Sequence, residues 1–198
     1  MATVVAALSM SLDGFIAHLN DGVGHLFDWY NNGEIDIEWP GNDIVSHVTP
    51  ASATYLRGSI AQVGALVVGR RLFDYTDGWG GRHPFGVPVF VVTHSVPDGW
   101  PRADAPFTIV TDGAQSPVAR ASKVAGDKDV EVAGPHVIQQ CLNAGLVHEL
   151  RIELVPVLLG EGIRFFDNLT NSPVTFENPT VIEGDRVTHL IYRRSDTP

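Results

Sequence analysis

The sequence has one cysteine, few basic residues and no long apolar run, and each shortage excludes a class of protein. A single cysteine, Cys141, cannot form an intramolecular disulfide framework. The 13 Lys and Arg residues stand against 23 Asp and Glu, for a net charge of −10. This balance argues against a nucleic-acid backbone or an anionic membrane as partner. No apolar stretch approaches the length of a membrane span.

Familiar catalytic and metal-binding motifs are missing as well. There is no Walker sequence, HExxH or GxSxG. The eight histidines are scattered without ligand spacing, so we expect no metal site. Two GxG triplets, Gly22–Gly24 and Gly160–Gly162, lack the third glycine of the dinucleotide fingerprint and are typical of turns. No signal-peptide pattern precedes the first apolar segment, so we expect a cytoplasmic location.

What the sequence does contain is typical of one α/β domain. Its 198 residues are 44% hydrophobic and 18% charged, which allows a sizeable core. Apolar and β-branched runs predict about eight strands. The predicted strands are Thr3–Leu8, Ala65–Gly69, Pro88–Thr93, Phe107–Thr111, Asp129–Ala133, Glu149–Leu158, Val174–Ile182 and Val187–Arg194. The last two flank a turn and predict a C-terminal antiparallel hairpin.

Helical patterns separate the earlier strands. Helices are predicted to start at Thr49-Pro50, at Ser116-Pro117 and at Pro135, and a short one to follow Gly69. Alternating strands and helices predict a mostly parallel sheet with right-handed crossovers. Residues 18–48 have weak periodicity and predict a long loop, which in a compact domain is a lid, a binding loop or a disordered segment.

A strand–turn–helix unit at Val130–Leu146 suggests an anion site. The strand feeds the predicted helix through Gly134-Pro135, and the first helical turn holds no acidic residue and no capping side chain. The free N–H groups of such a helix start favour a phosphate. The alternative is a Gly-Pro helix start whose N–H groups are satisfied by water.

Two further strand ends carry polar or basic side chains. Arg70 and Arg71 follow one buried strand, and Thr93-His94-Ser95 ends the next. Ligands of open parallel sheets bind beyond the carboxyl ends of the strands, and arginine matches phosphate oxygens bidentately. Salt bridges with some of the many acids are an equal alternative for the arginines. Together, the three strand ends predict an extended ligand with several phosphates.

Several blocks of sequence, in order along nearly the whole chain, carry a family resemblance. They are Ser11–Ala17 (SLDGFIA), Val68–Asp74 (VGRRLFD), Phe90–His94 (FVVTH), Ala144–Leu150 (AGLVHEL) and Pro156–Gly160 (PVLLG). The chain resembles the dihydrofolate-reductase-like family, which includes the reductase domain of bacterial riboflavin-biosynthesis deaminase/reductase proteins (the RibD C-terminal type). The resemblance implies one such domain over residues 1–198, NADPH bound across the strand ends, and a homodimer.

The resemblance also assigns roles to particular residues. It implies that Gly69, Arg70 and Arg71 face the adenosine-side phosphates, with Thr93 and His94 near the 2′-phosphate and adenine. Ser9 and Ile16 would approach the nicotinamide carboxamide. The pyrophosphate would be held by Ala133, Gly134, Pro135, His136 and Val137. The family usually has two adjacent glycines where this chain has Ala133-Gly134, and a methyl group there restricts the backbone.

The catalytic acid is the main departure from the family. Dihydrofolate reductases carry a carboxylate on the first long helix, whereas residues 51–55 here have none. Asp13, in the first loop, is a candidate acid, or else a turn aspartate bonded to its own backbone. Trp29 and Trp39, in the long loop, could cover a flat heterocycle against the nicotinamide, or simply pack the loop onto the domain.

The sequence therefore predicts an NADPH-dependent reductase that transfers hydride to a small heterocyclic or imine-like substrate, acting on a CH–NH or C=N bond. The arginines favour NADPH over NADH because they supply positive charge for a 2′-phosphate. Two alternatives remain open. One is a pyrimidine reductase like that of riboflavin biosynthesis, and the other is a non-catalytic protein that binds a nucleotide or pterin on the same fold.

Overall fold

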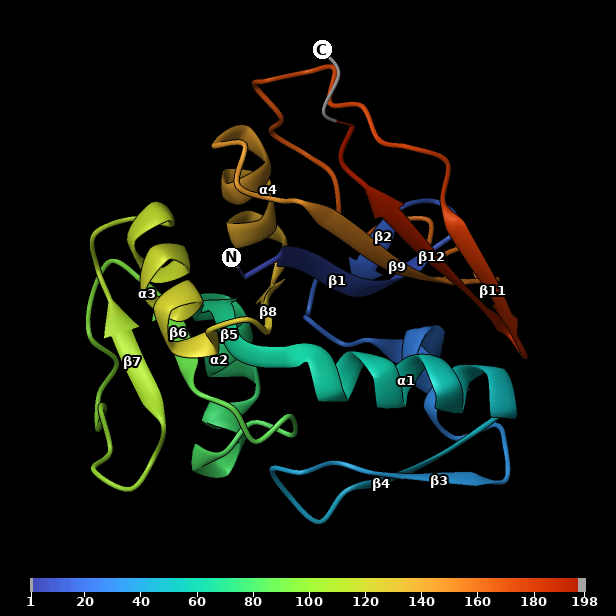
Figure 1. The fold of residues 1–198 in the computed structure, drawn as a ribbon, viewed down its shortest axis with the longest axis horizontal. Coiled ribbons are helices and arrows are strands. Elements are labelled where there is room, and N and C mark those ends of the chain that lie inside the picture. Colours follow the sequence, from blue (N-terminus) through green and yellow to red (C-terminus); the bar gives the residue numbers. More distant parts are fainter. Residues whose placement is uncertain (1, 196–198) are drawn as a thin grey trace.

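The computed structural model describes residues 2–195 and is built around an eight-stranded sheet (Figure 1). The strand order is β11-β12-β9-β1-β8-β5-β6-β7. In chain order the strands are β1 (Val4–Ser11), β5 (Val63–Gly69), β6 (Val89–Val92), β7 (Phe107–Val110), β8 (Asp129–Ala133), β9 (Glu149–Val155), β11 (Thr180–Gly184) and β12 (Val187–Arg193). All pairs from β9 to β7 are parallel, and β12 runs antiparallel to both of its neighbours. The predicted fold class is confirmed.

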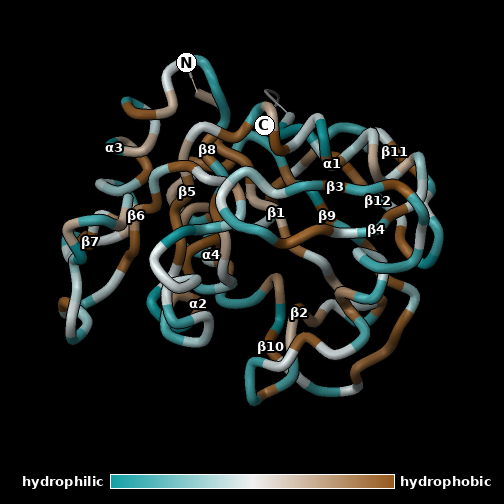
Figure 2. The backbone as a smooth tube through the Cα atoms, turned by 90° about the horizontal axis from the view of Figure 1, so that it is seen from below, coloured by the Kyte–Doolittle hydropathy of each residue, from teal (hydrophilic) through white to brown (hydrophobic). Residues whose placement is uncertain are grey.

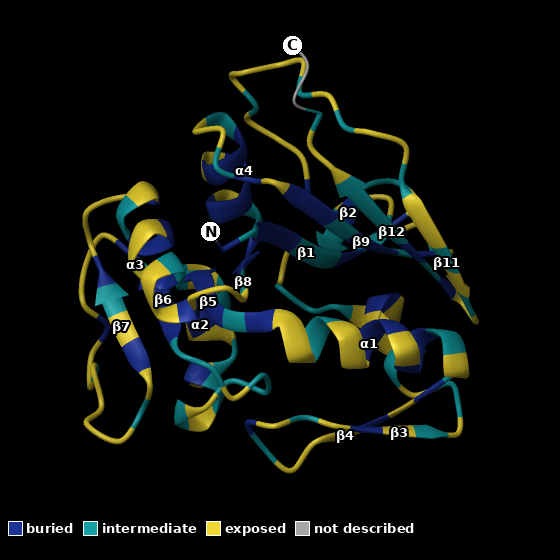
Figure 3. Cartoon of the chain, viewed as in Figure 1, coloured by how far each residue is buried: buried dark blue, intermediate teal, exposed yellow. Residues whose placement is uncertain are grey.

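Four α-helices cover the two faces of the sheet. They are α1 (Pro50–Gln62), α2 (Arg70–Tyr75), α3 (Gln115–Ala125) and α4 (Pro135–Asn143), which begin where the sequence predicts them. The helices α3 and α4 pack on one face of the central strands, while α1 packs on the other face beside β11 (Figure 1). The central strands are buried, and exposed residues gather on the outer helix surfaces and on β11 (Figure 3).

Two sequence predictions need correction. The strand predicted at residues 174–182 begins only at Thr180, because Pro173 and Pro179 have no N–H to donate to a ladder. The predicted loop at residues 18–48 contains a 3₁₀ helix, η1 (Gly24–Tyr30), and an antiparallel hairpin of β3 (Ile35–Glu38) and β4 (Val45–Val48).

That hairpin lies beyond α1 and covers it (Figure 1). The strands β2 (Phe15–Ala17) and β10 (Ile163–Arg164) form a second small ladder next to the end of β1. Hydrophobic residues concentrate in the strands of the main sheet, and hydrophilic residues in the segments that connect them (Figure 2). In the part of the chain that the structure describes, no helix has the length and apolarity to cross a membrane.

Candidate functional site

A cleft of about 1190 Å³ lies at the carboxyl ends of the parallel strands. Open α/β sheets bind their ligands in this position. Every residue assigned to the cofactor from the sequence lines this one cleft, although its role there stays a prediction. These residues are Ser9, Ile16, Gly69, Arg70, Arg71, Thr93, His94, Ala133, Gly134, Pro135, His136 and Val137.

The start of α4 is open toward the cleft. Gly134 precedes the helix with a φ of 100°, a conformation that favours glycine. No side chain caps the helix, and its first turn holds no acidic residue. A Cβ atom at Gly134 would lie in ordinary van der Waals contact, 3.5 Å from the amide nitrogen of Gly69, so the backbone conformation rather than a lack of space favours glycine here. The backbone here can hold an anion.

Arg70 links α2 to the end of β6. Its Nε donates to both carboxylate oxygens of Asp74 at 2.7 Å, and its Nη1 donates to the carbonyl oxygen of Ser95 at 3.1 Å and to Thr93 Oγ1 at 3.3 Å. The guanidinium therefore lies directly beside the polar end of β6. The role of Thr93 toward the cofactor's 2′-phosphate stays a prediction.

Arg71 reaches the opposite wall of the cleft. Its Nε lies 2.6 Å from Asp21 Oδ1, and its Nη2 donates to the carbonyl oxygen of Leu19 at 3.0 Å. Both arginines thus form the salt bridges that were the alternative to phosphate binding. Ion pairs this exposed contribute about 0–1 kcal/mol each, so a phosphate could displace either carboxylate.

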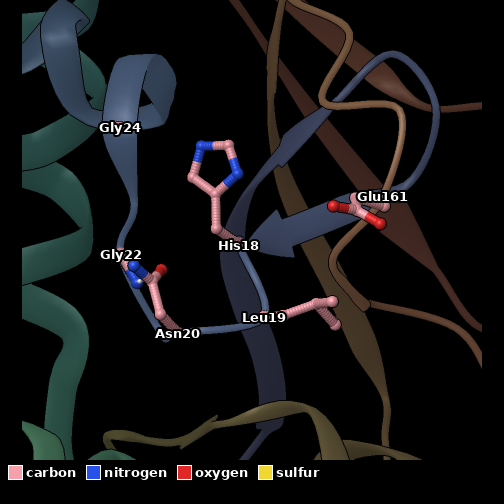
Figure 4. Close-up of a pocket in the computed structure, with 6 residues that line it drawn as sticks. All are labelled: His18, Leu19, Asn20, Gly22, Gly24 and Glu161. Carbon is pink, nitrogen blue, oxygen red and sulfur yellow. Dashed lines mark hydrogen bonds between the residues drawn. The ribbon is translucent and has the colours of Figure 1, made fainter.

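The loop that Arg71 holds also borders a second, shallower hollow of about 480 Å³ (Figure 4). His18 and Glu161 stand on two sides of this hollow, with Asn20 between His18 and the turn at Gly22. Among residues 2–195, no cluster of His, Cys, Asp or Glu could hold a metal ion.

Asp13 lies outside the lining of the cleft. Its carboxylate accepts hydrogen bonds from Ser11 Oγ at 2.5 Å and from the backbone N–H groups of Leu159 and Gly160 at 3.2 and 2.7 Å. The bond from Ser11, with those from the backbone, lowers the pKa of Asp13. An ionised carboxylate that holds two loops together favours the turn interpretation over the catalytic one.

The two tryptophans assigned to the substrate differ in position. Trp39 lines the cleft, whereas Trp29 is 0% exposed and does not. Trp29 stacks on Tyr30 with ring centroids 3.8 Å apart, and its Nε1 donates to Ser9 Oγ at 3.2 Å. Tyr30 does line the cleft, so Trp29 supports the wall from behind.

Truncating Trp29 should therefore affect stability. We expect Trp29→Ala to lower the free energy of unfolding by about 3–5 kcal/mol, because a fully buried ring is replaced by a cavity. Urea unfolding followed by circular dichroism measures the loss. Trp29→Phe, which keeps a ring, should lose less, and a cost below about 1 kcal/mol for the alanine variant would contradict this packing role.

The floor of the cleft holds buried carboxyl groups that the sequence interpretation missed. Glu131 on β8 and Glu153 on β9 line the cleft, as do Tyr55 of α1 and Arg151 of β9. Tyr55 Oη donates to Glu153 Oε1 at 2.5 Å. The available signal was an acid inside an apolar strand, in Val-Glu-Val and in Ile-Glu-Leu, where water cannot solvate it.

The charged groups of the cleft floor differ in how well they are paired with opposite charges. Arg151 is held by Glu149 at 2.7 Å and by Asp129 at 2.9 Å, so its charge is neutralised by those two acids. Burial, together with the negative charge of Glu153, raises the pKa of Glu131 to about 8. Burial also raises the pKa of Glu153 to about 7, against the bond from Tyr55, which lowers it. The floor can therefore hold a proton near neutral pH.

Comparisons with known proteins agree with this geometry. The family model described as the RibD C-terminal domain matches residues 2–181. The uncharacterized protein YwjB of Bacillus subtilis (strain 168) is 23% identical over 167 residues, 84% of each chain. A structure from Shewanella sp. PV-4, described as a candidate riboflavin biosynthesis protein, has a TM-score of 0.72 at 26% identity, covering 98% of this chain and 99% of that one.

A more distant structure shares the fold. Dihydrofolate reductase from Enterococcus faecalis, complexed with NADP(H) and RAB-propyl, has a TM-score of 0.56 at 14% identity. The match covers 98% of this chain and 97% of the reductase. The chain therefore has the dihydrofolate-reductase-like fold that its sequence predicts.

Proposed function

This chain belongs to the RibD C-terminal domain family, and on that premise we propose that it is an NADPH-dependent reductase of a small heterocyclic or imine-like substrate. One observation carries the proposal. A single cleft joins two arginines, an uncapped helix start and an aromatic wall to a buried acidic floor. The first two features suit a phosphorylated dinucleotide, and the last two suit a flat polar ring.

We assign three regions of the cleft to three parts of NADPH. Arg70 and Arg71, with Thr93 and His94, would hold the 2′-phosphate and adenosine side of NADPH. The backbone from Ala133 to Val137 would hold the pyrophosphate, and Ser9 and Ile16 would border the nicotinamide. When bound, NADPH supplies a hydride, while the protein orients the substrate and excludes water.

Two alternatives have support of their own. The family and the Shewanella relative favour a pyrimidine reductase of the riboflavin-pathway type. A protein that binds a nucleotide or pterin without turnover is favoured by the first long helix, whose residues 51–55 contain no carboxylate. We also propose a cytoplasmic homodimer, which light scattering of the purified protein would check.

Turnover distinguishes these functions. The experiment follows the loss of NADPH absorbance with pterins, quinones, imines and aminopyrimidines, each at several concentrations. We expect saturable oxidation of NADPH with at least one C=N substrate. A preference for aminopyrimidines would favour the riboflavin-type alternative. Tight NADPH binding with no oxidation by any of the panel would contradict the reductase proposal and favour the non-catalytic protein.

A further inference from the structure

The buried carboxyl groups of the cleft floor lie on one face of the sheet. Glu131 pairs with Val5, and Glu153 pairs with Ser9, on the two sides of β1. Val5 and Ser9 are an even number of residues apart, so their side chains, and those of the two glutamates, point to the same face. The central sheet thus presents two carboxyl groups toward the cleft.

Among the described residues, Arg151 is the cation that acts on both glutamates: its charge lowers the pKa of each. It lies nearby on the same face, although its salt bridges go to other acids, Asp129 and Glu149. Glu131 is only 8% exposed, and Glu153 is also buried. Both carboxyls are buried and the charge of Glu153 raises the pKa of Glu131, so it is costly to ionise both at neutral pH.

Tyr55 makes the two glutamates differ in how readily they ionise. Its phenol donates to Glu153, which stabilises the ionised form of that carboxyl, and its ring stacks on His189 with centroids 4.1 Å apart. Its side chain is therefore held from two directions. Burial and the charge of Glu153 raise the pKa of Glu131 to about 8, above that of Glu153 at about 7, so Glu131, which lines the cleft, keeps its proton to the higher pH.

We propose that Glu131 is the proton donor of the reaction, with Glu153 and Tyr55 as its positioning residues, and that the substrate is a nitrogen heterocycle reduced at a ring C=N bond. This inference rests on the proposed reductase function. It replaces the carboxylate missing from residues 51–55 with one from the middle of the sheet, and so gives the cleft an acid that the sequence interpretation did not find.

The step balances in atoms and electrons. The carbon of the substrate C=N bond accepts a hydride, which brings two electrons and one hydrogen. The nitrogen accepts the proton from the Glu131 carboxyl, so the C=N bond becomes CH–NH. Glu131 is left as a carboxylate, and its burial and the negative charge of Glu153 favour its reprotonation from water that enters the cleft.

The pH dependence follows from the groups around Glu131. Its pKa is raised to about 8 by burial and by Glu153, so the donor form is lost as the pH rises through about 8. We expect kcat to fall above that pH. The ionisable groups that act on Glu131 are Asp129 on its own strand, Arg151 and Glu153 on β9, and Tyr30 on η1. The groups next to these are Glu149, which pairs with Arg151, and Tyr55 and His189, which lie against Glu153.

A first test needs neither cofactor nor substrate. Infrared titration of the protein alone should show the carbonyl stretch of a protonated carboxylic acid at pH 7, lost as the pH rises through about 8. Glu131→Gln should remove the part of this band that is lost near pH 8 and leave the part from Glu153, which is lost near pH 7. Tyr55→Phe should raise the pH at which the pair loses its first proton, because ionised Glu153 then lacks its donor. Glu183→Gln, at an exposed position on β11, is the matched control and should leave the band unchanged.

A second test measures the role of the acid in turnover. With a substrate from the panel, Glu131→Gln should lower kcat by about 10²–10⁴-fold and leave the Kd for NADPH unchanged. Glu131→Asp should recover part of the loss, and Glu183→Gln should have wild-type rates.

The outcomes separate this inference from the proposed function. The acid assignment would be overturned if the Glu131→Gln variant turned over at the wild-type rate, or if the wild-type protein showed no protonated carboxyl band at pH 7. Either result would count against it even if NADPH is bound and oxidised. Absence of NADPH binding would instead refute the reductase proposal, and the infrared titration would still decide whether the acid pair exists.

Discussion

Arg71→Ala is expected to raise the Kd for NADPH by about 10–100-fold and to change the Kd for NADH by no more than about threefold. A charge-assisted hydrogen bond to a phosphate contributes roughly 1.5–3 kcal/mol to binding. NADH has no 2′-phosphate, so its binding does not depend on such a bond. Arg71 lines the cleft beside Gly69 and carries one of its two positive charges at the strand ends. Isothermal titration calorimetry with both dinucleotides measures the difference.

The ion pair between Arg71 and Asp21 provides a sharp control. If Arg71 only holds the loop at residues 18–22, then Asp21→Asn should weaken binding just as Arg71→Ala does. If Arg71 binds phosphate, Asp21→Asn removes a competing carboxylate and should tighten NADPH binding. Arg120→Ala, whose side chain pairs with Asp112 outside the cleft, should change neither affinity. Equal losses for NADPH and NADH would contradict the 2′-phosphate assignment.

Gly134→Val is expected to abolish measurable NADPH binding. The φ of 100° at this position disfavours a branched side chain, and the new atoms would fill the gap between the end of β8 and Gly69. We expect a stability loss of about 1–3 kcal/mol from the backbone strain. The larger effect is on the cofactor, because the pyrophosphate and the start of α4 lose their close approach.

Gly126→Val is the control that separates the effect of backbone strain from the effect on cofactor binding. Gly126 follows α3 with a φ of 65°, and a Cβ atom there meets open space. The variant should lose a comparable amount of stability, as measured by thermal unfolding, while binding NADPH like the wild type. A Gly134→Val protein that is folded and still binds NADPH within about threefold of the wild-type Kd would show that the ligand does not use this turn.

The fold follows from the sequence because apolar runs dominate it. Continuously apolar segments such as Ala65–Val68 suit central strands, and Pro and Gly mark the helix starts between them. The hairpin of β3 and β4 was missed because each strand has four residues, too few for the alternation of Ile35 and Ile37 with Asp36 and Glu38 to stand out. Its stability comes from packing against α1, which no local pattern reveals.

The candidate site was likewise only partly predictable from the sequence. Residues at strand ends, such as Arg70 and Gly134, were found because the carboxyl edge of a parallel sheet is a general binding position. Glu131 and Glu153 were missed because they interrupt otherwise apolar strands, and only the pairing of both strands with β1 places them on one face. Trp29 was assigned to the substrate because its loop places aromatic residues beside carboxylates, yet its ring packs behind Tyr30.

The central claim is that the strand ends of this acidic protein hold a phosphorylated nicotinamide dinucleotide. Calorimetric titration of the wild-type protein with NADPH tests it most directly. We expect saturable heat with a Kd between about 1 μM and 1 mM, the usual range for such ligands, and weaker binding of NADH. No saturable heat at near-millimolar NADPH would contradict the cofactor assignment and the reductase function together.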